Sequence, residues 1–232
     1  MISEKNLARF AGFCYLMVIA TGLFSEIFVR QALRVGNDAM ATAHNIQTNE
    51  MLFRWGIVAD LINFVIGLPA VLIIYHFFKK SNKIVLQIAL AFVIIQTAII
   101  AVNLLNQISP LLILGNDPYL NTFQQNQLAT LSLLFLNIQA QGYAIGLVFF
   151  GFYCILIGYV IYITNAIPKI IGVLYAVAGI CYLINSFTMF LSKGFTNPFF
   201  IYLAIPIFIG ELSLCLWLLI KGIDTSKLDY NR

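Results

Sequence analysis

Charged residues are scarce in this 232-residue chain. Asp, Glu, Lys and Arg together make up 9% of the sequence, against about 25% in an ordinary soluble domain. Aliphatic, aromatic and cysteine residues fill 61% of it, and a soluble fold of this size has too little interior to bury them all. The shortage of charge therefore excludes an ordinary soluble protein and indicates an integral membrane protein.

The sequence patterns of several familiar enzyme classes are also missing. There is no Gly-rich phosphate loop, no Gly-x-Ser-x-Gly elbow and no His-Glu-x-x-His helix. Nucleotide-driven transport, serine hydrolysis of the common kind and zinc proteolysis thus lack their usual signatures.

Cysteine and histidine are too few and too scattered for a metal site. The four cysteines lie inside apolar runs, with no disulfide or metal-finger spacing: Cys14, Cys154, Cys181 and Cys215. The two histidines, His44 and His76, are predicted near opposite faces of the membrane, so they cannot share a zinc ion. The sequence predicts no cofactor and no metal site.

Six apolar runs of roughly 20 residues, divided by short polar breaks, occupy most of the chain. About 20 helical residues cross a ~30 Å hydrocarbon layer. The runs are too long for barrel strands and lack a period of two, so they are helices. We predict a single all-α, six-transmembrane-helix membrane domain over residues 1–232, with spans near 10–28, 55–78, 84–109, 141–163, 170–192 and 199–220.

The distribution of the 13 Lys and Arg residues predicts the orientation. Positive charge near span ends is retained on the cytoplasmic side. With the N-terminus inside, the cytoplasmic residues would be Lys5, Arg9, Lys79, Lys80, Lys83, Lys169, Lys221, Lys227 and Arg232, and the outer ones Arg30, Arg34, Arg54 and Lys193. Both termini are therefore predicted to be cytoplasmic. The basic residues line no single face, so no nucleic-acid partner is expected.

Two of the outer connections have the pattern of amphipathic helices. The first lies between Asp38 and Glu50, with Asp38 as its N-cap. The second begins near Thr122, which has capping-box spacing to Gln125. Continued to residue 163, this second helix would measure about 63 Å, roughly twice what a bilayer needs. We therefore expect a break or bend near Gly142.

Polar residues inside the spans are the candidate site, because a charge at mid-bilayer is costly and normally faces protein or water. Several recur at helical spacing, such as Gly56, Asp60, Asn63 and Gly67 in the second span. Their similar depth predicts a polar pocket open to the extracytoplasmic side, with Glu211 as its floor. The predicted ligand-binding residues are Glu26, Arg54, Asp60, Asn103, Gln107, Asn137, Gln141, Asn185 and Glu211.

A purely structural role competes with this interpretation. Asn, Gln and Ser in membrane bundles often serve only as interhelical hydrogen bonds. The carboxylates are a different case. If the pocket exists, three of them, Glu26, Asp60 and Glu211, face mainly one basic residue, Arg54. This excess of negative charge favours a bound cation or a bound proton. Arg54 is expected to brace Asp60 or to extend toward the interface rather than to act as a catalytic group.

Four blocks of the chain resemble the domain of unknown function 4386 family, which are bacterial multi-span membrane proteins. The blocks are residues 8–16, 49–61, 133–137 and 168–187. The most specific is Leu-Phe-Arg-x-Gly-x-x-x-Asp-Leu, which begins at Leu52 and contains Arg54 and Asp60. The resemblance implies a multi-span protein of the bacterial cytoplasmic membrane and an important Arg54–Asp60 region, but no activity. Asn185 stands where the resemblance leads us to expect an acidic residue.

Three classes of function stay open at this point. The first is a protein that binds or transports a small molecule, cation or lipid in the predicted pocket. The second is an intramembrane enzyme on a lipid-borne substrate, with Asp60 or Glu26 as acid or base and Arg54 holding a phosphate or carboxylate. The third is an accessory subunit of a membrane complex. Besides the bilayer, a second copy and another membrane protein both stay open as partners.

Overall fold

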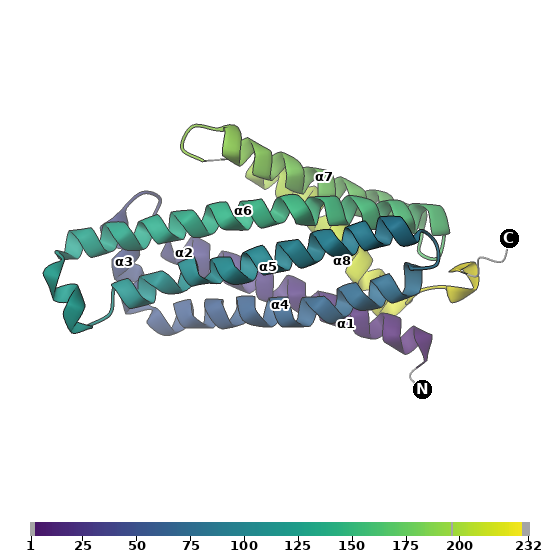
Figure 1. The fold of residues 1–232 in the computed structure, drawn as a ribbon, viewed down its shortest axis with the longest axis horizontal. Helices are drawn as coiled ribbons and strands as arrows, with labels where there is room; N and C mark the ends of the chain where they lie inside the picture. The colour runs from purple at the N-terminus through teal and green to yellow at the C-terminus, as the bar shows by residue number, and fades with distance from the viewer. Residues whose placement is uncertain (1–2, 196, 229–232) are drawn as a thin grey trace.

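The structure is a computed structural model that describes residues 3–195 and 197–228 (Figure 1). Within these residues it is helical, with no strand. Six helical segments are long and apolar enough to cross a membrane. The first joins α1 (Glu4–Leu23), the π-helix η1 (Phe24–Arg30) and α2 (Gln31–Leu33), and the others are α4 (Glu50–Phe78), α5 (Lys83–Ile113), α6 (Gln125–Thr164), α7 (Lys169–Leu191) and α8 (Phe200–Ile220). The predicted fold class of six membrane helices is confirmed.

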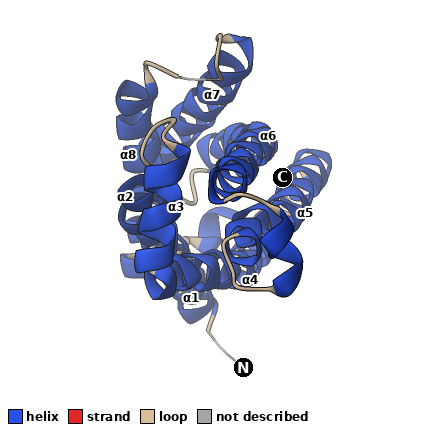
Figure 2. Ribbon diagram, turned by 90° about the vertical axis from the view of Figure 1, so that its left-hand side faces the viewer, coloured by secondary structure: helices blue, strands red, loops and turns tan. Residues whose placement is uncertain are grey.

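The six spans form a closed ring in chain order. α1 packs against α4, α4 against α5, α5 against α6, α6 against α7 and α7 against α8, and α8 returns to α1. Figure 2 shows the helices viewed roughly along their long axes, from the end where α3 lies. Because every span has two neighbours, the side chains on the inner face of the ring come from all six helices.

One end of the ring, which we call the α3 end, carries most of the structure between the spans. The short helix α3 (Ala39–Thr48) lies there against α6, and the 3-10 helix η2 (Pro118–Thr122) precedes α6. Asp38 caps α3 by accepting a hydrogen bond from the Ala41 N–H at 2.9 Å. The predicted surface helix and its N-cap are therefore confirmed.

The helix α6 runs without interruption for 40 residues, so the expected break near Gly142 is wrong. It begins at Gln125, with a capping box between Gln124 and Gln127 rather than at Thr122. Gly142 serves packing instead of bending, because a Cβ at this position would collide with the Asn103 amide of α5. The glycine lets α5 and α6 approach each other at a buried asparagine.

Glycines also set the closest contact between α6 and α7. A Cβ on Gly158 would lie 2.5 Å from the Gly172 carbonyl oxygen, and one on Gly172 would lie 2.7 Å from the Gly158 oxygen. Gly151 and Gly179 repeat this arrangement two turns away. Small residues let membrane helices pack backbone to backbone, which replaces the hydrophobic driving force that lipid does not supply.

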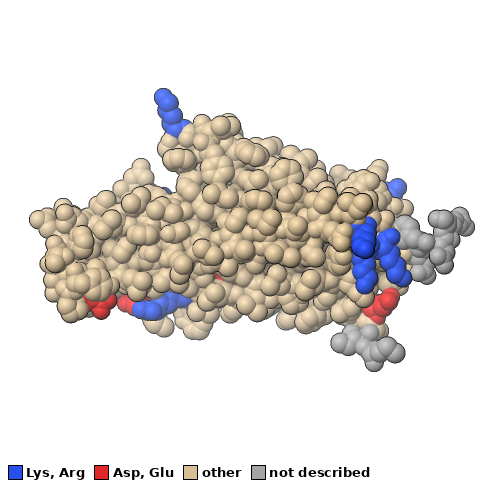
Figure 3. Space-filling model, viewed as in Figure 1, with Lys and Arg blue, Asp and Glu red and all other residues tan. Residues whose placement is uncertain are grey.

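Both termini lie at the end opposite α3, which we call the terminal end (Figure 1). On the face shown in Figure 3, charged side chains gather toward the two ends, and the broad zone between them is almost entirely uncharged. This band is what a bilayer-spanning surface requires. Arg232, one of the residues used to predict orientation, lies outside the described residues.

Candidate functional site

The inner face of the helix ring lines a partly open cavity of about 1250 Å³. All six spans and α3 contribute to its wall. Most of the wall is apolar, and Arg34 of the connection after α2 and Thr42 of α3 line it at the α3 end. The charged or phenolic side chains that line this central cavity within the spans are Tyr15, Glu26, Arg30, Tyr143, Tyr153, Tyr175, Tyr182 and Glu211.

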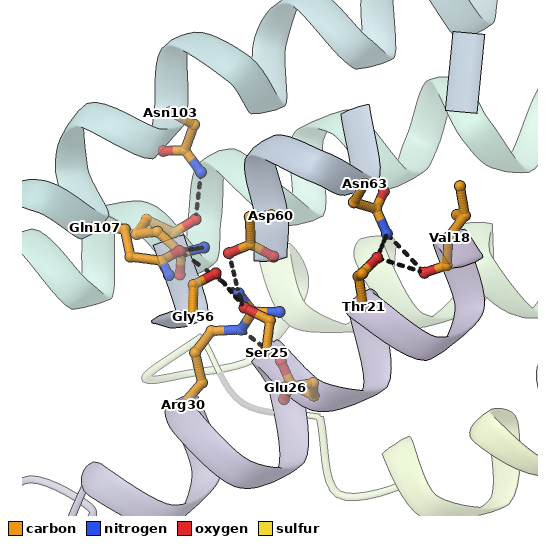
Figure 4. Close-up of polar contacts among 11 residues, drawn as sticks. Val18, Thr21, Ser25, Glu26, Arg30, Gly56, Asp60, Asn63, Asn103 and Gln107 are labelled. Carbon is orange, nitrogen blue, oxygen red and sulfur yellow. Dashed lines mark hydrogen bonds and ion pairs between the residues drawn. The ribbon is translucent and has the colours of Figure 1, made fainter. Parts of the chain in front are cut away.

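Arg30 forms the centre of the principal charged cluster (Figure 4). Its Nε donates to Glu26 Oε2 at 2.7 Å, and its Nη1 donates to Asp60 Oδ2 at 2.8 Å and to Ser25 Oγ at 3.0 Å. The Gln107 Oε1 atom lies 3.5 Å from the same Nη1. We call these five residues the Arg30 network. One cation thus holds two carboxylates from different helices.

The π-helix η1 places three members of this network on one side of the first span. Ser25, Glu26 and Arg30 all fall within it, and the Gln31 N–H that ends it bonds to the Glu26 carbonyl five residues back. Single-turn π segments inside α-helices occur frequently at functional sites. Here the wider turn lets Arg30 reach a residue four and a residue five positions earlier at the same time.

The polar residues of α4 share one side of the helix, as their spacing predicts, and the structure shows that this side faces the first span. Ser25 Oγ donates to the Gly56 carbonyl at 3.1 Å, and Asn63 Nδ2 donates to the Val18 carbonyl at 2.7 Å. A Cβ on Gly56 would lie 2.7 Å from Val29, so the glycine permits this approach. This polar side therefore joins two spans and presents Asp60 to Arg30.

Behind the Arg30 network, buried amides join α5 to α6. Asn103 Nδ2 donates to the Gln139 carbonyl at 2.7 Å, and Gln139 Nε2 lies 3.5 Å from Gln107 Oε1. Asn106 Nδ2 donates to Asn103 Oδ1 at 2.9 Å. These bonds extend the network across a third and a fourth span. Most of the amides are interhelical connectors, which is the structural role weighed for them from the sequence.

A second polar cluster lies across the cavity, away from Arg30. Tyr182 Oη donates to Glu211 Oε1 at 2.6 Å, and Tyr15 Oη donates to Tyr175 Oη at 3.1 Å. These side chains come from α1, α7 and α8, and all four line the cavity. Glu211 forms no ion pair with a basic side chain of the described residues.

Arg34 is a third polar feature of the wall. Its Nη2 donates to Asn137 Oδ1 at 2.5 Å, and no carboxylate of the described residues lies within ion-pair distance of it. Burial lowers the pKa of its guanidinium, and the Glu26 charge raises it. The group still carries a full positive charge at neutral pH. Arg34 thus offers a cation to the cavity with donor groups left over.

The structure divides the nine predicted site residues into separate groups. Glu26, Asp60, Gln107 and Asn103 belong to the connected polar cluster around Arg30. Of the nine, those that line the cavity are Glu26, Asn185 and Glu211.

The remaining predicted residues have local partners or none. Asn185 Oδ1 accepts from Asn197 at 2.7 Å, and Asn137 accepts from Arg34. The Gln141 Oε1 atom is buried without a hydrogen-bond partner among the described residues. The nine residues therefore do not converge as one group.

Two roles were expected for Arg54: the bracing of Asp60 is wrong, whereas a side chain extended away from the bundle agrees with its exposed position. Arg54 bonds to Glu50 one turn before it, at 2.6 Å, and the two side chains are 52% and 51% exposed. Asp60 bonds to Arg30 instead, with side chains 9% and 16% exposed. Arg54 stands six positions before Asp60, a spacing that places the two side chains on different sides of α4.

Sequence reasoning missed Arg30, which it placed in an outer loop. The first span was expected to end at Phe28, whereas the helix continues to Leu33. The four-residue spacing of Glu26 and Arg30 was the available signal, because this spacing favours an ion pair on a continuing helix. Tyr143, whose ring lies 5.6 Å from the Arg30 guanidinium carbon, was also missed.

Within residues 3–195 and 197–228, no three His, Cys, Asp or Glu side chains stand close enough together to hold a metal ion. The family model described as domain of unknown function (DUF4386) matches residues 10–222. The chain belongs to this family. Comparisons with curated proteins and with solved structures each found no match. The DUF4386 blocks in α1, α4, α6 and α7 thus coincide with four of the six walls of the cavity.

Proposed function

We propose that this DUF4386 protein binds a lipid-like amphiphile with an anionic headgroup inside its central cavity. The observation that carries the proposal is one elongated cavity, about 1250 Å³ in volume, with mainly apolar walls and Arg34 at one end. Pockets for ordinary small molecules measure about 300–1,000 Å³ and are mostly apolar with a few polar groups. This cavity exceeds that range, as a ligand with a long hydrocarbon chain requires.

The extent of the cavity along α4 supports an elongated ligand. Its lining residues on this helix run from Phe53 near the α3 end to Ile74 near the terminal end. At 1.5 Å per residue this is about 30 Å, close to the thickness of the hydrocarbon layer. An acyl or prenyl chain lying parallel to the helices would replace lipid contacts with contacts to the cavity wall.

The charges around the cavity favour an anionic headgroup at the α3 end. Arg30 is already neutralised by Glu26 and Asp60, whereas the Arg34 side chain has, among residues 3–195 and 197–228, only the neutral Asn137 as a partner. Guanidinium groups bind carboxylates and phosphates through paired N–H donors. A headgroup at Arg34 would leave the chain to extend past Tyr143 toward the middle of the cavity.

The proposal includes an orientation, in which both termini are cytoplasmic and the α3 end faces the outside of a bacterial cytoplasmic membrane. Lys79, Lys80 and Lys83 lie at the terminal end, and the positive-inside rule places this end in the cytoplasm. We propose that the ligand enters at the α3 end, where Arg34 and Thr42 line the cavity, and so from the extracytoplasmic side or the outer leaflet.

Cysteine accessibility tests this orientation, and the protein suits the method because Cys14, Cys154, Cys181 and Cys215 are all buried. In intact cells, an impermeant maleimide is expected to label an Asn121→Cys variant and to leave a Lys80→Cys variant unlabelled until the membrane is opened. Both positions are exposed. The reverse pattern would place the α3 end in the cytoplasm and contradict this part of the proposal.

Photolabelling tests the ligand. A fatty acid with a diazirine in its chain, added to purified protein in nanodiscs, is expected to attach to inward residues such as Phe64 and Leu147. An Ala204→Phe substitution, which fills part of the cavity, should reduce this labelling several-fold. The matched control is Ala101→Phe on an outward-facing position of α5. Adducts confined to outward residues such as Val65 and Val102 would contradict binding in the cavity.

Arginine variants test the headgroup assignment. Loss of a charge-assisted hydrogen bond costs about 1.5–3 kcal/mol, so Arg34→Ala should weaken fatty-acid labelling about 10-fold or more. Arg54→Ala is the matched control, because Arg54 lies at the same end of the protein but outside the cavity wall. Equal labelling of the two variants would remove Arg34 from the binding site.

A further inference from the structure

Glu211 is a carboxylate within a membrane span, and it has no positively charged partner in the part of the chain that the structure describes. It lies midway along α8 and lines the cavity, and its Oε1 accepts the Tyr182 hydroxyl at 2.6 Å. No hydrogen bond of the described residues reaches its Oε2 atom. Glu211 therefore differs from Glu26 and Asp60, which share the Arg30 guanidinium.

The titratable groups around Glu211 supply no compensating charge. The helix α8 packs mainly against α7 and α1, and α6 lies across the cavity. The titratable side chains that interact electrostatically with Glu211 are Tyr15 of α1, Tyr143 and Cys154 of α6, Tyr175 and Tyr182 of α7, and Cys215 of α8. Phenols and thiols are neutral near pH 7, so each of them lacks a positive charge.

An ionised carboxylate in this position would be an unpaired charge inside the bilayer. Such a charge is costly, and the group is normally neutralised by a proton or a cation. The Tyr182 hydroxyl orients the carboxyl group and satisfies one of its oxygens, while the other oxygen is left to the cavity. The surroundings thus hold the group in place without fixing its charge.

We propose that Glu211 is a proton-binding site in the middle of the membrane, which takes up and releases its proton through the central cavity. Tyr182 is a positioning residue for this site, because its hydroxyl holds the carboxyl group on the cavity wall. The inference is independent of the lipid-like ligand, since it concerns only the side chains around Glu211. The alternative is that Glu211 binds a monovalent metal cation, and the experiment must distinguish this from proton binding.

Dicyclohexylcarbodiimide provides a direct test, because it modifies protonated carboxyl groups in apolar surroundings. The acid proton passes to a carbodiimide nitrogen, the carboxylate oxygen bonds to the central carbon, and the adduct rearranges to a stable N-acylurea that peptide mapping detects. Labelling of Glu211 in purified protein is expected to fall by about tenfold per pH unit once the group is mostly ionised. Glu26, a cavity carboxylate paired with Arg30, is the internal control and should stay unlabelled.

Two results would overturn the proposal. Protection of Glu211 by Na⁺ at constant pH, with choline as the ionic-strength control, would assign the site to a metal cation.

Infrared spectra provide a measurement that does not depend on reagent access. A protonated-carboxyl band should appear on acidification of the wild-type protein and be lost from the Glu211→Gln variant. Identical spectra of the two proteins across the pH range in which both stay folded would show that Glu211 binds no exchangeable proton.

Discussion

Replacing Arg30 by methionine is expected to lower the free energy of unfolding by about 3–5 kcal/mol, because removal of one member of a buried ion pair leaves an uncompensated charge. Arg30 holds the buried Asp60 at 2.8 Å, whereas Glu26 at 2.7 Å is 40% exposed and also accepts from Gln31, so the loss falls mainly on Asp60. Reversible unfolding of the purified protein in detergent would measure the change.

The control is Arg54→Met, which breaks an exposed pair with Glu50. Exposed pairs contribute about 0–1 kcal/mol, so this variant should unfold almost like the wild type. A double variant, Arg30→Met with Asp60→Leu, should recover much of the loss, because apolar replacement of a whole buried pair is often neutral. Similar losses in the Arg30 and Arg54 variants would refute the central place given to Arg30.

The second large effect is expected from Gly158→Ala in α6. The added Cβ would lie 2.5 Å from the Gly172 carbonyl oxygen and 2.8 Å from the Ala176 backbone nitrogen, both atoms of the facing helix. Overpacking of this kind costs typically about 1–3 kcal/mol. Because alanine is the better helix former by about 1 kcal/mol, a net loss of stability must come from the contact between helices.

Gly67→Ala in α4 is the matched control, for which no loss of stability is expected. Its new Cβ would meet only Val18 Cγ2 at 3.6 Å, an ordinary contact. Helix propensity should then dominate, and the variant should unfold at the same temperature as the wild type or a higher one. If both glycine variants gain stability, the backbone contact between α6 and α7 is looser than described.

The membrane fold was largely predictable because hydropathy and length act locally. All six spans were found, and the ends of those near 170–192 and 199–220 agree with α7 and α8 within one residue. At the α3 end the predictions made two spans too short: the first was expected to end at residue 28 but continues to Leu33, and the fourth was expected to begin at residue 141 but begins at Gln125. At those ends the helices extend past the length that a bilayer requires, and tertiary contacts, such as those of α6 with α3, hold the extra turns.

The candidate site was predictable only in part. Helical spacing correctly placed Asp60 and Asn63 on the side of α4 that faces the first span. The choice of Arg54 over Arg30 failed because sequence separation alone does not reveal which arginine lies opposite a carboxylate. That choice depends on the π-helix η1 and on the continuation of the span to Leu33, for which the four-residue spacing of Glu26 and Arg30 was the one local signal.

The circular arrangement of the spans has a consequence for biosynthesis. Ribosomes deliver membrane segments in order from the N-terminus, and the pair that joins Arg30 to Asp60 belongs to the first two segments. Neutralisation of these charges can thus accompany early insertion. The segment bearing Glu211 arrives last, and only its docking between α7 and α1 completes the ring of helices. Nascent chains halted before α8 would therefore possess the ion-paired half but lack the last wall of the cavity.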